Sequence, residues 1–197
     1  DMLPLYGMTG AKTPFMDVIA AAAKVKAEDI LAHDLILYSR VPAAIWGEER
    51  EFISSPKLDD LQCAFACFRG FTQGQKEKYI SVYALFDNEE VGSATSQGAG
   101  STFLANTLER LARSLGYSYD ETMAMIARSF MISADNAHSV HPNHPEYADP
   151  VNHPVINGGI VIKYSAAQKY ATNAFSAAYF KKLCKDHDIP TQTFTNH

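Results

Sequence analysis

Cysteine is scarce in this sequence: the 197 residues include three, Cys63, Cys67 and Cys184. An odd count without a Cys-x-x-Cys pair is typical of reduced, mostly buried thiols in a cytoplasmic protein rather than of a disulfide framework. No apolar run approaches the ~20 residues that a membrane-spanning helix needs. Runs of lysine and arginine are also missing, and the formal net charge is −5. We therefore expect neither nucleic acid nor membrane as a partner.

The N-terminus lacks an initiator methionine, since the chain begins Asp1-Met2-Leu3-Pro4, and it shows no basic segment followed by an apolar one. We expect a piece of a longer chain, without a signal peptide. A composition that is 47% hydrophobic and 20% charged suits one globular domain, or one domain with part of another. We place a domain boundary near residue 50, which gives segments 1–50 and 51–197.

Segments rich in β-branched and aromatic residues alternate with segments of helical spacing. The predicted strands are 34–38, 79–86, 130–134, 159–164 and 192–195. The predicted helices are 13–25, a short turn at 27–31, 61–68, 101–115, 121–128 and 171–185. Thr13 and Asp120 are the expected N-caps, and Gly116 the expected stop of one helix. This alternation predicts an α/β fold with a mixed central sheet and helices on both faces.

The acidic segment Asp87-Asn88-Glu89-Glu90-Val91-Gly92-Ser93 follows the predicted strand 79–86. Open α/β sheets place their ligands at the carboxyl ends of strands. Three carboxylates within four residues repel one another, and a bound divalent cation would offset that repulsion. A turn at Gly92 would let one glutamate hold a metal while its neighbour faces the substrate. A solvated acidic loop is the alternative.

Two further carboxylates lie at the ends of predicted elements, Asp59 at a helix start and Asp135 after the strand 130–134. Together with Glu90 they could converge on one sheet edge, where one carboxylate can bridge two divalent cations ~3.5–4 Å apart. Such cations lower the pKa of water towards ~7, and Glu89 is placed to take the proton. For Asp59, simple helix capping remains open.

Four motifs in this order resemble the aspartyl aminopeptidase and aminopeptidase I family of zinc metallopeptidases. They are Ser55–Asp59, the segment Asp87–Ser93 followed by Gln97-Gly98-Ala99, Ser133–Asn143 and Gly159–Tyr164. A lone Glu-Glu pair would not be specific, whereas four ordered motifs are. The resemblance implies an incomplete zinc-peptidase-like α/β/α sandwich. It also implies an enzyme that removes acidic or neutral N-terminal residues from peptides with metal-activated water.

The resemblance implies a role for six residues. Asp59 would bridge two Zn²⁺ ions, Glu90 and Asp135 would be terminal ligands, Glu89 would be the general base, and His141 and Lys163 would line the substrate cleft. Four of the seven histidines lie between residues 138 and 153. We interpret His138 and His144 as polar loop residues hydrogen-bonded to the backbone. A separate zinc site in this loop is the less favoured alternative.

The chain departs from the family pattern in ways that affect activity. The family has two histidine zinc ligands, one near each end of its catalytic domain, and neither segment is present, nor should His197 be given that role. Residues 1–50 resemble the end of an inserted dimerisation domain, and residues 51–197 the central part of the catalytic domain. We expect two Zn²⁺ in a complete, cytoplasmic homo-oligomer, a dodecamer by resemblance. The piece alone is expected to hold no zinc pair and to be inactive.

Two other functions remain open. A glutamyl-aminopeptidase-like enzyme would share the Glu-Glu pair, although the contexts of Asp59 and Asp135 argue against it. A non-catalytic binding or assembly module would keep the fold without the metals. Zinc content separates an enzyme from such a module.

Overall fold

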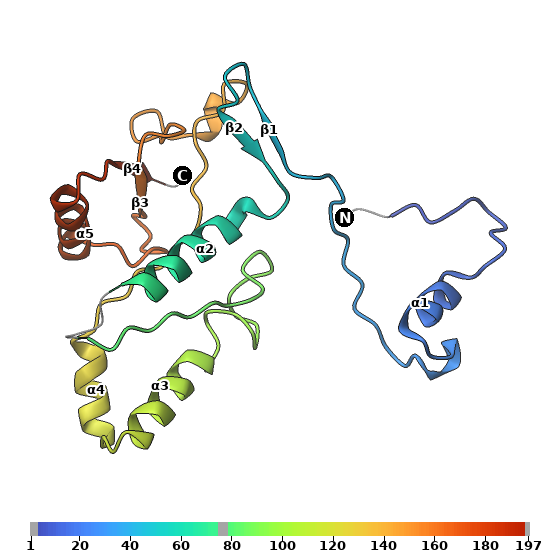
Figure 1. The fold of residues 1–197 in the computed structure, drawn as a ribbon, viewed down its shortest axis with the longest axis horizontal. Coiled ribbons are helices and arrows are strands. Elements are labelled where there is room, and N and C mark those ends of the chain that lie inside the picture. Colours follow the sequence, from blue (N-terminus) through green and yellow to red (C-terminus); the bar gives the residue numbers. More distant parts are fainter. Residues whose placement is uncertain (1–3, 75–78, 196–197) are drawn as a thin grey trace. The chain divides into compact units, whose positions relative to one another are not determined.

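The computed structural model describes residues 4–74 and 79–195, and the chain divides into two compact units, Asp1–Ala43 and Ala44–His197. Figure 1 shows helices and short strands in one chain. In chain order the elements are α1 (Phe15–Ala23), the 3₁₀ helix η1 (Ala27–Asp29), β1 (Ala44–Trp46), β2 (Phe52–Ser54), α2 (Leu58–Gln73), α3 (Phe103–Ser114), α4 (Tyr119–Ala127), the 3₁₀ helix η2 (Pro145–Tyr147), β3 (Ile160–Tyr164), α5 (Ala174–Asp186) and β4 (Thr191–Thr195). None of the helices in these described ranges is long and apolar enough to cross a membrane. The predicted α/β class is confirmed.

The first unit is built on α1. Pro14 occupies the N-cap position, so the predicted cap at Thr13 is wrong. The Tyr6 hydroxyl donates to the Thr13 carbonyl oxygen at 3.1 Å, and the Tyr6 ring packs edge-on against Phe15 with centroids 5.0 Å apart. These contacts hold the segment before α1 against the helix. Residues 34–38 are assigned to no strand, so that expectation is also wrong.

The second unit begins with an antiparallel hairpin of β1 and β2, in which Ala44 pairs with Ser54. The Trp46 and Phe52 rings lie 4.7 Å apart, and Trp46 Nε1 donates to Ser54 Oγ at 2.6 Å. Gly47 turns the chain with φ at +100°, a conformation that favours glycine. The hairpin leads directly into α2 and so into Asp59. The division into units falls just before this hairpin, whereas the assignment of 1–50 and 51–197 to two domains of a longer enzyme stays a prediction.

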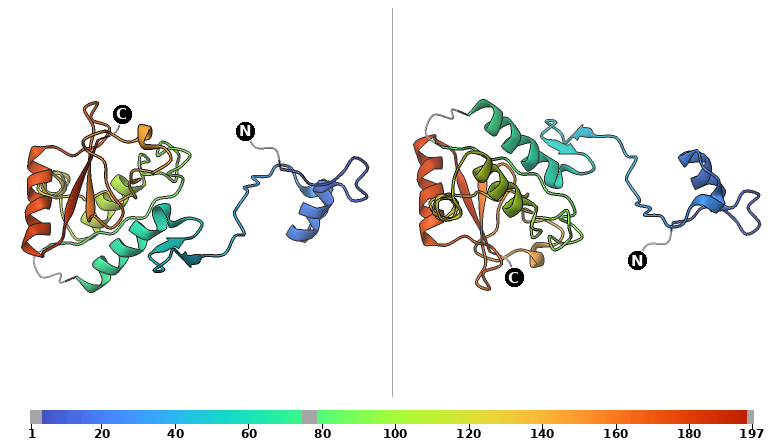
Figure 2. Two further views of the ribbon diagram at one scale, coloured as in Figure 1. Left: turned by 90° about the horizontal axis from the view of Figure 1, so that it is seen from above. Right: turned by 90° about the horizontal axis from the view of Figure 1, so that it is seen from below.

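The parallel pair β3 and β4 forms a separate two-stranded sheet of the second unit, in register from Ile160 opposite Thr191 to Tyr164 opposite Thr195. A parallel pair needs a crossover connection, and α5 supplies it, running beside the two strands (Figures 1 and 2). Ile162 and Phe194 of the strands are buried, as are Ala177 and Cys184 of α5. The predictions of two strands at 159–164 and 192–195 and of a helix between them are confirmed.

Helices α3 and α4 form a hairpin closed by Gly116, whose φ is +88°. The predicted stop at Gly116 is confirmed. At the start of α4, Ser118 accepts from the Glu121 backbone N–H while Glu121 accepts from the Ser118 N–H. This capping box shows that Asp120, predicted as the cap, lies inside the first turn instead.

Residues 79–86 and 130–134 are assigned to no strand, so these two strand predictions are wrong. Their apolar side chains pack on helices instead. The Tyr83 ring lies 5.8 Å from that of Phe68 on α2, and the Phe130 ring lies 4.8 Å from that of Tyr179 on α5. β-branched and aromatic residues favour extended backbone, but a strand also needs a neighbouring strand for its N–H and C=O groups.

Burial on β3 predicts which isoleucine supports this unit. Ile162 is 7% exposed and Ile160 43% exposed. We expect Ile162→Ala to lower the free energy of unfolding by ~2–5 kcal/mol, since it leaves a cavity, and Ile160→Ala to cost clearly less. Denaturant unfolding of both variants tests this, and equal losses would contradict the packing described.

Candidate metal centre

Asp59 lies at the start of α2 but does not belong to its regular part. Asp59 and Asp60 have non-helical φ/ψ values of −82°/116° and −111°/20°, and in this described helix no side chain caps the N-terminus. The peptide bond between these two residues is cis. The capping alternative for Asp59 therefore finds no support, and its carboxyl group is free to meet carboxylates from other segments.

Asp59 and Asp135 are neighbours in the structure, although 76 positions separate them in the sequence (135 − 59). Partial burial raises the pKa of Asp59, and the charge of Asp135, a hydrogen bond with its side chain and the charges of Glu90 and Asp60 raise it further. A bound divalent cation would offset the repulsion between these carboxylates.

The acidic turn is held by its own backbone. The Gly92 N–H donates to the carbonyl oxygens of Asn88 and Glu89 at 3.0 and 2.9 Å, and Gly92 has φ at +117° while Asn88 has φ at +62°. The Asn88 N–H also donates to Asp87 Oδ1 at 2.8 Å. The predicted turn at Gly92 is confirmed, and it presents Glu89 and Glu90 side by side.

Glu89 belongs to the same electrostatic field as the aspartates. Partial burial raises its pKa, and the charges of Asp135, Glu90 and Asp59 add to the effect. All four of these side chains are exposed to solvent. The structure thus brings Asp59, Glu89, Glu90 and Asp135 into electrostatic reach of one another at a surface that water and small molecules can reach.

Lys163 is the positive charge at this cluster. It projects from β3, and its Nζ lies 2.7 Å from Asp135 Oδ2 and donates to the Asn136 carbonyl oxygen, also at 2.7 Å. Its side chain is 19% exposed, whereas that of Asp135 is 39% exposed. The residue predicted to line a substrate cleft therefore directly contacts one of the predicted metal ligands.

His141 lies in the histidine-rich loop, and its Nδ1 accepts a hydrogen bond from the Asn143 N–H at 3.2 Å. Because Nδ1 acts as an acceptor, the proton of the neutral ring sits on Nε2. The His141 ring lies 5.8 Å from that of His144. His141 is thus available as a donor through Nε2.

The other loop histidines have structural partners. His144 Nδ1 lies 3.0 Å from Glu146 Oε1, and the His138 ring packs edge-on against Phe194 at 5.0 Å. The backbone of His144 is also hydrogen-bonded within the loop, since its N–H donates to the His141 carbonyl oxygen at 3.0 Å. A contact between ring and backbone occurs at His153, whose Nδ1 lies 2.9 Å from the Asp149 carbonyl oxygen.

A metal site needs several ligand side chains that converge on one point. Among the described residues, no group of three or more His, Cys, Asp or Glu side chains is arranged to hold a metal ion, in the histidine loop or elsewhere. The carboxylates around Asp59 and Asp135 nevertheless offer oxygen ligands and excess negative charge, which suit a divalent cation. Zinc additionally prefers nitrogen or sulfur. The cluster fits part of a zinc site, with ligands still to be added.

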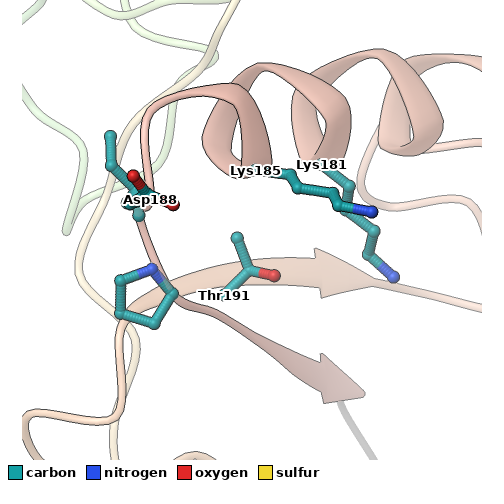
Figure 3. A pocket seen from close by; sticks show the side chains of 6 residues that line it. Lys181, Lys185, Asp188 and Thr191 are labelled. Atoms are coloured by element: carbon teal, nitrogen blue, oxygen red, sulfur yellow. The ribbon is translucent and has the colours of Figure 1, made fainter.

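A hollow of about 690 Å³ lies between the end of α5 and the start of β4. Figure 3 shows Lys181, Lys185, Asp188 and Thr191 around it. None of the predicted site residues lines this hollow. It is therefore separate from the carboxylate cluster.

Two residues of the cluster were not predicted from the sequence. Asn136 follows Asp135, and its side chain contacts Cys63 and Leu58 of α2. The sequence offered only a weak indication that Asn136 and Cys63 belong to the cluster. Cys63 lies one helical turn beyond Asp59, and Asn136 adjoins a predicted ligand.

Comparison with known proteins places the chain among peptidases. Residues 8–197 match the family model described as aminopeptidase I zinc metalloprotease (M18). A probable M18 family aminopeptidase 2 of Clostridium novyi is 42% identical over 200 residues, which cover 100% of this chain and 46% of that protein. Aspartyl aminopeptidase 4 of Saccharomyces cerevisiae is 37% identical over 180 residues, covering 85% of this chain and 37% of the relative.

The comparison with solved structures points to the same family as the comparison of sequences. The crystal structure of yeast aminopeptidase 1 has a TM-score of 0.74 and 28% identity, with 91% of this chain and 43% of that chain covered. An M18 aminopeptidase from Thermotoga maritima reaches a TM-score of 0.80 at 24% identity, covers 98% of this chain and 45% of the other, and supports the fold alone. The chain spans about half the length of the curated relatives it matches. Because the family model covers nearly the whole chain and its fold recurs in solved members, the chain belongs to the aminopeptidase I zinc metalloprotease (M18) family.

Proposed function

We propose that the complete protein is a two-zinc aminopeptidase that removes acidic or neutral residues from the N-termini of peptides. The observation that supports this proposal is that Asp59 lies close enough to Glu90 and Asp135, which come from two other segments, for their charges to raise its pKa. Membership of a zinc metalloprotease family supports it. Because the chain spans about half of its relatives' length, the activity is proposed for the complete protein, and we expect the 197-residue chain alone to lack it.

Three carboxylates would hold the zinc ions. Asp59 would bridge the pair, and Glu90 and Asp135 would each serve one ion. When bound, zinc supplies a Lewis acid for the substrate carbonyl and lowers the pKa of water. The proximity of Asp59 and Asp135 supports this assignment, because the charge of Asp135 raises the pKa of Asp59.

Glu89 would act as the general base. The turn closed by Gly92 fixes the backbone of both glutamates, so that Glu89 can face the substrate while Glu90 remains with the metals. A carboxylate that binds no metal can accept a proton from water and return it to the leaving amine. Its place in the same field as Asp59 and Asp135 supports this role.

Lys163 and His141 would bind the substrate. The ammonium group of Lys163 is held at the cluster by Asp135 and the Asn136 carbonyl oxygen, where it could also attract a negatively charged group of the substrate. His141 offers a donor through Nε2, because Nδ1 accepts from the Asn143 N–H. Two relatives are named aspartyl aminopeptidases, which supports acidic N-terminal residues among the substrates.

The remaining expectations concern the assembly. We propose a cytoplasmic homo-oligomer, and the structure of a yeast Ape1 dodecamer, with a TM-score of 0.72 and 28% identity, supports a dodecamer. Peptides are the proposed partners, with no role for nucleic acid or membranes. Residues 1–50 are proposed as the end of a dimerisation domain and residues 51–197 as the centre of the catalytic domain. A glutamyl-aminopeptidase-like enzyme is less favoured, because the family match is to M18.

Replacing the proposed base separates catalysis from metal binding. In the complete protein we expect Glu89→Gln to retain both zinc ions and to lower the turnover rate ~10²–10⁴-fold, because it removes only the proton acceptor. Metal analysis and peptide hydrolysis rates measure the two effects. Zinc loss in proportion to activity would instead make Glu89 a ligand.

Replacing the ligands tests the proposed bridge. Asp59→Asn should lower occupancy at both metal positions, since a bridging carboxylate serves two ions, whereas Glu90→Gln should affect mainly one. Zinc per chain, measured after dialysis, distinguishes them, with Asp60→Asn as the matched control that retains zinc. Full zinc in Asp59→Asn would refute the bridge, whereas an unmodified protein without zinc would favour a non-catalytic module.

A further inference from the structure

Asn136 connects the two segments that carry the aspartates. Its Nδ2 donates to the Leu58 carbonyl oxygen at 3.2 Å, and its Oδ1 accepts from Cys63 Sγ at 2.8 Å. Leu58 directly precedes Asp59, and Asn136 directly follows Asp135. One side chain thus spans the start of α2 and the segment after residues 130–134.

The amide of Asn136 satisfies two opposite requirements at once. The Leu58 carbonyl oxygen needs a donor, and the Cys63 thiol in this contact needs an acceptor, so neither a carboxylate nor an apolar side chain could serve both. Burial raises the pKa of the Cys63 thiol, which keeps its proton available for donation. The amide orientation follows from this pair of partners.

The backbone of Asn136 makes a second connection, to Lys163 on β3. Its carbonyl oxygen accepts from Lys163 Nζ at 2.7 Å, and the same ammonium group contacts Asp135 Oδ2. The path therefore runs from α2 through Asn136 to β3 and back to Asp135. Every step is a direct polar contact.

The hydrogen bonds of Asn136 oppose the electrostatic repulsion between the two segments that carry the aspartates. Asp59 and Asp135 carry like charges, with Asp60 beside the first and Glu90 in the acidic turn, and like charges brought together repel one another. We propose that Asn136, anchored by the Cys63 thiol, is a positioning residue that sets the separation of Asp59 and Asp135 for metal binding. This inference rests on the proposed function.

Groups that orient metal ligands typically contribute ~10–100-fold to metal affinity. In the complete protein, zinc affinity measured by competition with a chromogenic chelator should fall ~10–100-fold in Asn136→Leu, which has a similar size but makes neither hydrogen bond. Cys63→Ala should weaken zinc binding to a smaller degree. Cys63→Ser keeps a hydroxyl donor and should recover most of the affinity.

Cys67→Ala is the matched control, because this second thiol of α2 is exposed and, among the described residues, it is Cys63 whose thiol bonds to the Asn136 side chain. It should bind zinc as the unmodified protein does. Thermal unfolding of the metal-free variants shows whether each is folded when its affinity is measured. If Cys63→Ala and Asn136→Leu act through one link, the double variant should be no weaker than Asn136→Leu alone.

The outcomes separate the two proposals. Unchanged zinc affinity in Asn136→Leu, together with a loss in Asp59→Asn, would overturn the positioning role while leaving the ligand assignment intact. Unchanged affinity in both would overturn the proposed metal site itself. If Asn136→Leu does not fold, the comparison of Cys63→Ala with Cys63→Ser decides, and equal affinities in these two would overturn the role of the thiol link.

Discussion

Mutual repulsion among carboxylates is the constraint on which the rest of this site depends. Asp59 and Asp135 come from distant parts of the chain, yet they lie close enough for the charge of Asp135 to raise the pKa of Asp59. Neighbouring like charges are unfavourable unless a proton or a cation offsets their repulsion. The surrounding contacts can be understood as the means by which the fold holds the aspartates in this arrangement.

Three structural elements supply those contacts. The sheet strand β3 places Lys163 against Asp135, and α2 provides the partners of the Asn136 side chain. Burial of Ile162 and Phe194 beside Ala177 and Cys184 of α5 fixes the strand pair itself. The apolar packing of α5 on β3 and β4 is thereby connected to the position of one ammonium group at the site.

The acidic turn is held by local backbone interactions. Positive φ values at Asn88 and Gly92 and two hydrogen bonds to the Gly92 N–H form a tight turn. This turn places two adjacent glutamates on a fixed backbone, whereas in a regular strand they would face opposite sides. Such a turn suits a site in which Glu89 and Glu90 are proposed to take different roles, one as the base and the other as a metal ligand.

The sequence by itself determined the features that depend on short segments. Helical spacing predicted α2, α3, α4 and α5, Gly116 predicted the end of α3, and alternation of element types predicted the α/β class, all confirmed. Ordered motifs predicted the family, because each motif is a contiguous stretch of side chains whose chemistry can be recognised without coordinates.

Only the tertiary structure decided the features that depend on distant partners. Residues 79–86 and 130–134 have the composition of strands but are assigned to none, since pairing is a property of two segments and not of one. The cap of α4 is an exception, because Ser118 and Glu121 form a capping box, which is a local pattern that the sequence already carries. The links of Asp135 to Lys163 and of Asn136 to Cys63 join residues 28 and 73 positions apart. Such contacts arise from how the chain folds back on itself, and no local pattern encodes them.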